Sequence, residues 1–161
     1  MTLEQYSYIA QIVASIGVVA SLIYVARQLV QNTRMMRASV SNDRVQRDFD
    51  LSGALFNNRE FAEIWCKARD GLDTLDEVDR VRVVMHSRSA LKHWQNMFAL
   101  RQQGLVSDAD WNELKWLICY FGRSQITREA WKIFGDSFDA PFQKFMEQQL
   151  AKAGRDKASG D

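Results

Sequence analysis

Hydrophobic and polar positions divide this chain into two unlike regions. From Gln5 to Ala26 no side chain is charged and most are apolar. A helix of this length spans roughly 33 Å, slightly more than the hydrocarbon core of a bilayer, which is about 30 Å thick. Tyr6 and Tyr8 lie at one end of the run and Tyr24 at the other, as in the aromatic belts of membrane helices. Residues 5–26 therefore predict a transmembrane helix.

Two alternatives compete with this interpretation of the run. A cleaved signal peptide would begin with basic residues, whereas Glu4 is the only charged side chain before residue 5. A buried helix of a soluble bundle is the stronger alternative, because Gln11, Ser15, Gly17 and Ser21 reduce the hydropathy. Buried helices seldom extend this far without a charge on one face, and the pattern therefore favours the membrane.

Small side chains recur along one face of the predicted span, at spacings of three and four residues. We call them the seam: Ser7, Ala10, Ala14, Gly17 and Ser21. In lipid, small residues let two helix backbones approach closely, and this approach is a main source of helix association. The seam predicts self-association or docking onto the membrane helix of another subunit. The alternative is chance, because Ala, Gly and Ser are common in any membrane helix.

The helical pattern continues beyond the span, since no glycine or proline lies between Gly17 and Gly53. Residues 27–54 are predicted to form a basic juxtamembrane helical stalk. Near the cytoplasmic leaflet, basic side chains attract anionic lipid headgroups. We assign this contact to three residues of the stalk, Arg27, Arg34 and Arg37. Arg44 and Arg47 lie further from the bilayer and are expected to face solvent.

Flanking charge predicts the orientation of the span. Five arginines occur between residues 27 and 47, whereas only Glu4 and the α-amino group precede the span. The positive-inside rule then places the C-terminal region in the cytoplasm and the N-terminus outside. We expect a single-pass protein of the inner (cytoplasmic) membrane.

The second region, residues 55–150, contains the start and stop signals of several helices. Asn57-Asn58 precedes one helix, Thr74 with Glu77 fits a capping box before a long helix ending near Gly104, and Ser107 precedes a third. Asp139-Ala140-Pro141 predicts the start of a last helix. No strand pattern competes. The fold class is all-α, with four or five cytoplasmic helices and a disordered tail over residues 151–161.

Composition and charge exclude some functions. The chain has 161 residues, and 21 Lys+Arg against 20 Asp+Glu give a net charge of +1. Nucleic-acid-binding domains usually have a marked basic excess, so we expect no nucleic-acid partner. The hydrophobic content of 47% is that of a folded chain. Two cysteines, Cys66 and Cys119, cannot form a disulfide-rich scaffold.

Candidate chemistry is sparse. His86 and His93 are the only histidines, and on a helix they lie about 10 Å apart, too far to share a metal ion. No phosphate-binding loop, dinucleotide fingerprint, nucleophile elbow or zinc-protease motif occurs. We therefore predict no catalytic residue, no metal site, no cofactor and no enzymatic activity.

Five tryptophans are many for a domain of this size: Trp65, Trp94, Trp111, Trp116 and Trp131. They are candidates for an apolar ligand pocket or an aromatic surface for a protein partner. The alternative is an ordinary core, which is the more frequent role of aromatic residues at helical spacing.

Parts of the sequence resemble a group of proteins. Val19–Gln28, closed by Gln31-Asn32-Thr33, resembles the opening of a widespread group of uncharacterised bacterial proteins with one N-terminal membrane helix and a small cytoplasmic helical domain. Phe61–Trp65 and Asp110-Trp111 are similar to later positions of that group, so the likeness spans most of the chain. The resemblance implies membrane anchoring and this architecture. It implies no activity and no catalytic residues.

Three functions fit these patterns. The first is a non-enzymatic, membrane-anchored helical protein that acts as a self-associating scaffold or as an accessory subunit of a membrane complex. Its partners would be membrane lipids and either copies of itself or other membrane-protein subunits. The second is a membrane-anchored sensor with a tryptophan-rich apolar pocket. The third is a homo-oligomeric channel in which Gln11 or Ser15 faces a pore.

Overall fold

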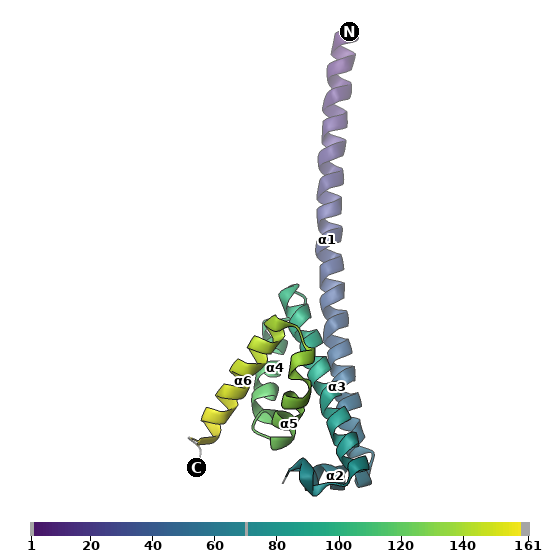
Figure 1. The fold of residues 1–161 in the computed structure, drawn as a ribbon. Helices are drawn as coiled ribbons and strands as arrows, with labels where there is room; N and C mark the ends of the chain where they lie inside the picture. Colours follow the sequence, from purple (N-terminus) through teal and green to yellow (C-terminus); the bar gives the residue numbers. More distant parts are fainter. Residues whose placement is uncertain (1, 70, 159–161) are drawn as a thin grey trace. The chain divides into compact units, whose positions relative to one another are not determined.

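The computed structural model describes residues 2–69 and 71–158, and within them every regular element is helical. The first helix, α1 (Leu3–Phe56), is one uninterrupted helix (Figure 1). Five further α-helices follow: α2 (Arg59–Ala68), α3 (Glu77–Gln102), α4 (Asp108–Phe121), α5 (Gln125–Phe134) and α6 (Ala140–Ala158). Two short 3₁₀ turns, η1 (Leu72–Thr74) and η2 (Gly135–Ser137), precede α3 and α6. The predicted all-α class is confirmed.

Two compact units divide the chain, and their boundary lies within α1, after Ser39. The first unit contains the uncharged run. Over its most apolar 18-residue window α1 has a mean hydropathy of 2.2, and none of that window is buried. By length and composition this segment of α1 is a candidate membrane span.

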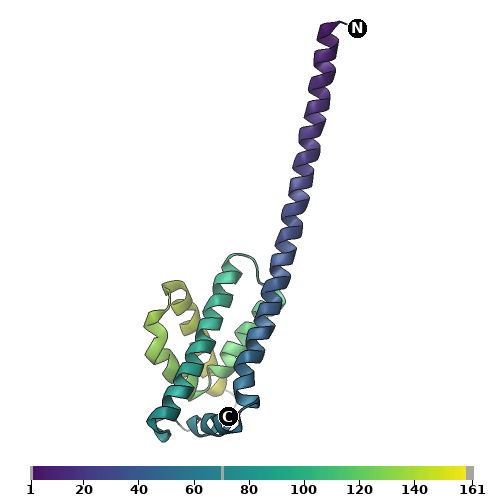
Figure 2. The same ribbon diagram turned by 90° about the vertical axis from the view of Figure 1, so that its right-hand side faces the viewer.

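The second unit begins at Val40, inside the segment predicted as a stalk. One face of α1 explains this boundary, because its side chains are buried or half-buried there at spacings of three and four residues. These are Val40, Arg44, Asp48, Leu51 and Leu55. Within this unit the end of α1 lies beside α3 (Figures 1 and 2). Residues 40–54 are therefore part of the folded domain.

The apolar core of the second unit consists of two clusters. The larger one joins α3, α4, α5 and α6 around side chains that are almost fully buried, including Leu91, Met97, Ile118, Phe142 and Met146. The smaller one joins α2, η1, α3 and α5 around Phe61, Ile64, Leu72, Val83 and Ile126. Together the two clusters fix the mutual positions of α2 to α6.

Most predicted helix ends are confirmed by hydrogen bonds. Asn58 accepts a hydrogen bond from the Phe61 amide, and Ser107 accepts one from the Asp110 amide. Gly104, just after α3, has a φ of 72°, a conformation that favours glycine. The predicted capping box at Thr74 is wrong, because Asp76 caps α3 by accepting from the Asp79 amide.

A tight turn explains this difference. Gly71 has a φ of 127°, which lets the chain turn into η1. The Thr74 hydroxyl then donates to the Lys67 and Gly71 carbonyl oxygens instead of capping α3.

The predicted disordered tail also begins too early. Residues 151–158 continue α6, and Ala153 is fully buried. Small side chains allow this packing, since Ala153 lies beside Gly122 at the end of α4. The last three residues of the predicted tail, 159–161, lie outside the described residues.

Candidate functional site

The seam residues are all exposed in the first unit. Two serines of the span satisfy their hydroxyl groups locally: Ser15 donates to the Gln11 carbonyl oxygen and Ser21 to that of Gly17, each at 2.8 Å. Gly17 has open space around the position of a Cβ atom. The seam therefore presents an exposed face, and the hydroxyl of its Ser21 is bonded within the helix.

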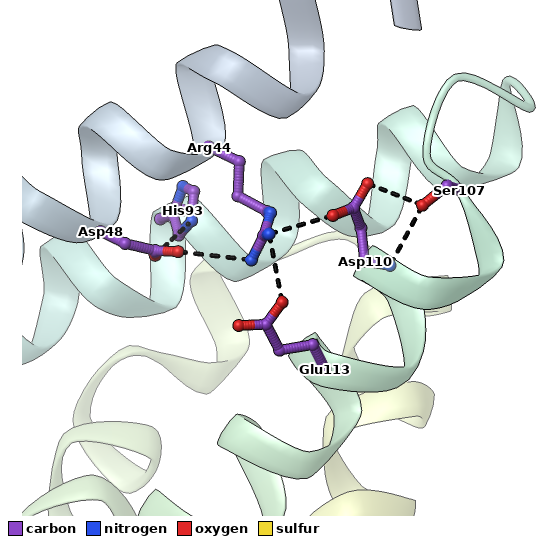
Figure 3. A network of polar contacts seen from close by, with 6 residues as sticks. All are labelled: Arg44, Asp48, His93, Ser107, Asp110 and Glu113. Carbon is purple, nitrogen blue, oxygen red and sulfur yellow. Dashed lines mark hydrogen bonds and ion pairs between the residues drawn. The ribbon is translucent and has the colours of Figure 1, made fainter. Parts of the chain in front are cut away.

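The three arginines assigned to lipid contact, Arg27, Arg34 and Arg37, are exposed as well. Arg44 differs from them, and the expectation that it faces solvent is wrong. Only 9% of Arg44 is exposed. Its guanidinium ties α1 to α4 through Asp110 at 3.0 Å and Glu113 at 3.1 Å, and it approaches Asp48 on its own helix at 3.5 Å (Figure 3).

His93 of α3 extends this polar network. Its Nε2 atom lies 3.3 Å from Asp48 Oδ1, and the residue is 8% exposed (Figure 3). The two atoms are close enough for an ion pair, but they are not aligned for a hydrogen bond. His93 Nε2 and Arg44 Nε are both buried without a hydrogen-bond partner among the described residues. Hydrogen bonds weaken steeply when they are misaligned. The network is therefore incompletely satisfied.

The cap of α4 positions one carboxylate of this network. The Ser107 hydroxyl donates to Asp110 Oδ2 at 2.7 Å and accepts from the Asp110 amide at 3.1 Å. The other carboxylate oxygen of Asp110 accepts from Arg44. Nothing near Asp110 in the sequence predicts its contact with Arg44. The spacing of Val40, Arg44 and Asp48 along one helix face was the available signal for the network.

The five tryptophans do not form one site. Trp111 packs with Phe98 and Phe145, and Trp131 stacks on Phe138 at a centroid distance of 5.6 Å. Trp116 is 63% exposed and stacks on Tyr120.

The remaining two, Trp65 and Trp94, line a cavity of about 330 Å³ within the second unit. Its walls come from α1, α2, α3, α4 and α5. This volume lies at the lower end of the range for small-molecule sites.

His86 also lines this cavity. Its ring contacts Phe61 and Trp65 edge-on at centroid distances of 5.4 and 5.2 Å. Burial lowers the pKa of His86 below its ordinary value of 6.5, because the charged form is desolvated there. At neutral pH the cavity wall therefore carries an uncharged imidazole at this position.

The other side chains that could act as nucleophiles or metal ligands do not gather at one site among the described residues. Cys66 is exposed and Cys119 is buried. Within residues 2–69 and 71–158 no three His, Cys, Asp or Glu side chains gather in a way that could hold a metal ion.

No protein-family model, curated protein or solved structure matches the chain. Membership of the bacterial group named above therefore stays a prediction.

Proposed function

We propose that this chain is a non-enzymatic, single-pass membrane protein that associates with itself through the seam and acts as a scaffold or an accessory subunit of a membrane complex. One observation carries the proposal. The apolar segment of α1 has no buried residue in its most apolar window, and it presents five small residues on one face. In a membrane, lipid would cover the apolar side chains of this segment. A second helix packed on the small residues would gain close contact between the two backbones.

Flanking charge supports the inner-membrane location, with the N-terminus outside and the domain in the cytoplasm. Glu4 precedes the span, and the exposed Arg27, Arg34 and Arg37 follow it. At the cytoplasmic leaflet these arginines would meet anionic headgroups, each contact contributing about 1 kcal/mol near the surface.

Exposed apolar groups on the domain support a role in protein contacts. Val78, Val81 and Met85 are exposed at spacings of three and four residues on α3, which places them on one face. Trp116 and Tyr120 form a stacked, exposed pair on α4. Aromatic residues and methionine are enriched in protein interfaces. These surfaces suit contacts with other subunits in the cytoplasm.

The self-association can be tested by making the same Ser→Ile substitution at two positions that lie on different faces of the helix. Ser21 lies in the seam, whereas Ser15 lies about a third of a turn away from it. Both serines are exposed and both lose the same local 2.8 Å hydrogen bond when replaced. We expect Ser21→Ile to weaken the oligomer at least tenfold, because the larger side chain separates the helix backbones, and Ser15→Ile to leave it unchanged.

The measurement is energy transfer between donor- and acceptor-labelled full-length chains in liposomes, as a function of protein-to-lipid ratio. Equal effects of the two variants would contradict association through the seam. Absence of energy transfer for the unmodified chain, together with no co-purifying membrane subunit, would contradict the proposed function as a whole.

A further inference from the structure

Side chains of both hydrophobic clusters of the domain line the cavity of about 330 Å³. Leu91, Trp94 and Ala130 on its wall belong to the larger cluster, whereas Leu55 and Trp65 pack with the smaller one. Protein interiors are normally packed to the density of organic crystals. At about 30 Å³ for each water molecule, the space equals roughly eleven waters. A space of this volume has the size of a site for a small molecule.

Aromatic and acidic side chains line this cavity together. Trp65, Trp94 and Phe121 contribute rings, and Asp48 and Glu113 contribute carboxylates. Among the described residues no Lys or Arg belongs to the lining, and burial lowers the pKa of His86, which favours the uncharged imidazole at neutral pH. Aromatic faces attract cations, most strongly when both are removed from water. The chemistry of the walls therefore favours an apolar ligand with a positive charge.

Charge in the adjoining network points the same way. Arg44 contacts three carboxylates, those of Asp48, Asp110 and Glu113, so one guanidinium serves all three. His93 touches Asp48 but forms no hydrogen bond of acceptable geometry with it. Glu113 has a second oxygen to offer, because only its Oε2 atom is engaged by Arg44. Two of these carboxylates, Asp48 and Glu113, also face the cavity.

From this geometry we propose that the cavity binds a small organic ammonium ion with an aryl or alkyl body. The ammonium group meets Asp48 and Glu113, and the apolar body packs between Trp94, Phe121 and Trp65. A ligand of about ten non-hydrogen atoms matches the volume. This site adds a binding activity to the cytoplasmic domain and does not depend on association through the seam.

The test compares three probes that share a phenyl body but differ in charge: 2-phenylethylammonium, neutral 2-phenylethanol and anionic 3-phenylpropanoate. Titration calorimetry uses the full chain in a non-ionic detergent, with empty micelles as the blank and phosphate as the buffer. We expect the ammonium probe to bind at least tenfold more tightly than the alcohol, since hydrogen bonds to charged groups are the stronger ones. The carboxylate probe should show no binding.

Two variants locate the site. Glu113→Gln keeps the shape of the side chain and should weaken the ammonium probe about tenfold, whereas the matched Glu129→Gln, on α5 and outside the cavity, should not. Ala90→Leu adds three carbons to the cavity wall and should weaken both the ammonium and the alcohol probe. Circular dichroism of each variant confirms that the domain is folded.

Three results would overturn the proposal. The first is equal binding of all three probes. The second is tighter binding of the carboxylate than of the ammonium. The third is an unchanged affinity for the ammonium probe in folded Ala90→Leu.

Discussion

Arg44 places a full positive charge in the interior of the domain, where burial is costly unless the charge is paired. Its terminal nitrogens meet carboxylates of α1 and α4, whereas its Nε atom is buried without a hydrogen-bond partner in the part of the chain that the structure describes. The carboxylates on the other side of these pairs are more exposed than Arg44, and ion pairs of this kind add little net stability compared with apolar packing. Arg44 therefore determines how α1 and α4 are joined more than how stable the domain is.

Substitution of Arg44 tests this account. We expect Arg44→Met to lower the free energy of unfolding by about 1–3 kcal/mol, because the half-buried Asp110 loses a charge-assisted hydrogen bond, whereas water solvates the more exposed Asp48 and Glu113. The matched Arg47→Met, on the exposed side of the same helix, should change it by less than about 0.5 kcal/mol. Urea unfolding of the full chain in detergent, followed by tryptophan fluorescence, measures both, since all five tryptophans lie in the domain.

A triple variant separates lost charge compensation from lost packing. Adding Asp110→Asn and Glu113→Gln to Arg44→Met should restore most of the lost stability, because the unpaired charges are removed with their partner. No recovery in the triple variant would show that Arg44 acts through the packing of its side-chain stem.

At the scale of elements, the close approach of α6 to the end of α4 depends on a glycine. A Cβ atom on Gly122 would lie 2.8 Å from the Ile118 carbonyl oxygen and 3.0 Å from Leu150 Cδ2. Leu150 and Ala153 are both buried on α6. Because Gly122 has no side chain, Leu150 and Ala153 can pack against the end of α4. This packing stabilises α6 beyond residue 150, where the composition predicts a disordered tail.

Two alanine substitutions with opposite expected signs test this contact. Gly122→Ala should destabilise the domain by about 1–3 kcal/mol, because the added methyl group overpacks the α4–α6 contact. Gly53→Ala, inside α1, should stabilise it by up to about 1 kcal/mol, since only the flexible end of the Asn57 side chain lies near the new methyl group. The same urea titration measures both. Stabilisation by Gly122→Ala would contradict the proposed role of this glycine.

At the scale of the whole molecule, the exposed Cys66 and the buried Cys119 provide a test of topology. If the domain is cytoplasmic, a membrane-impermeant maleimide should label Cys66 only after bacterial cells expressing the chain are permeabilised. Thr2→Cys in a Cys66→Ser background should be labelled in intact cells, because the N-terminus then lies outside. Label incorporation is read by mass spectrometry of the purified chain.

The reverse labelling pattern would place the domain outside. Release of the chain from membranes by alkaline carbonate would contradict the span itself. The two outcomes therefore distinguish a wrong orientation from a wrong assignment of α1.

Features of this protein that depend on contacts between residues close in sequence can be predicted, whereas those that depend on distant residues cannot. Helix ends at Asn58, Gly104 and Ser107 are predictable, because each depends on contacts within a few residues along the chain. Thr74 fits a local rule equally well, but the 3₁₀ turn after Gly71 occupies its hydroxyl. Trp65 and Trp94 line the cavity whereas the other three tryptophans pack or stack elsewhere, and no local pattern distinguishes the two sets.

The sequence by itself determines the all-helical class, most of the helix ends and the candidate membrane span, because periodicity and local hydrogen bonds suffice for them. Only the tertiary structure decides that the domain begins at Val40, that Arg44 is buried and that side chains of both clusters line one cavity. Arg44 and Asp110 are 66 positions apart. No local pattern specifies which charged residues form an ion pair across such a separation, since the pairing depends on how the helices pack.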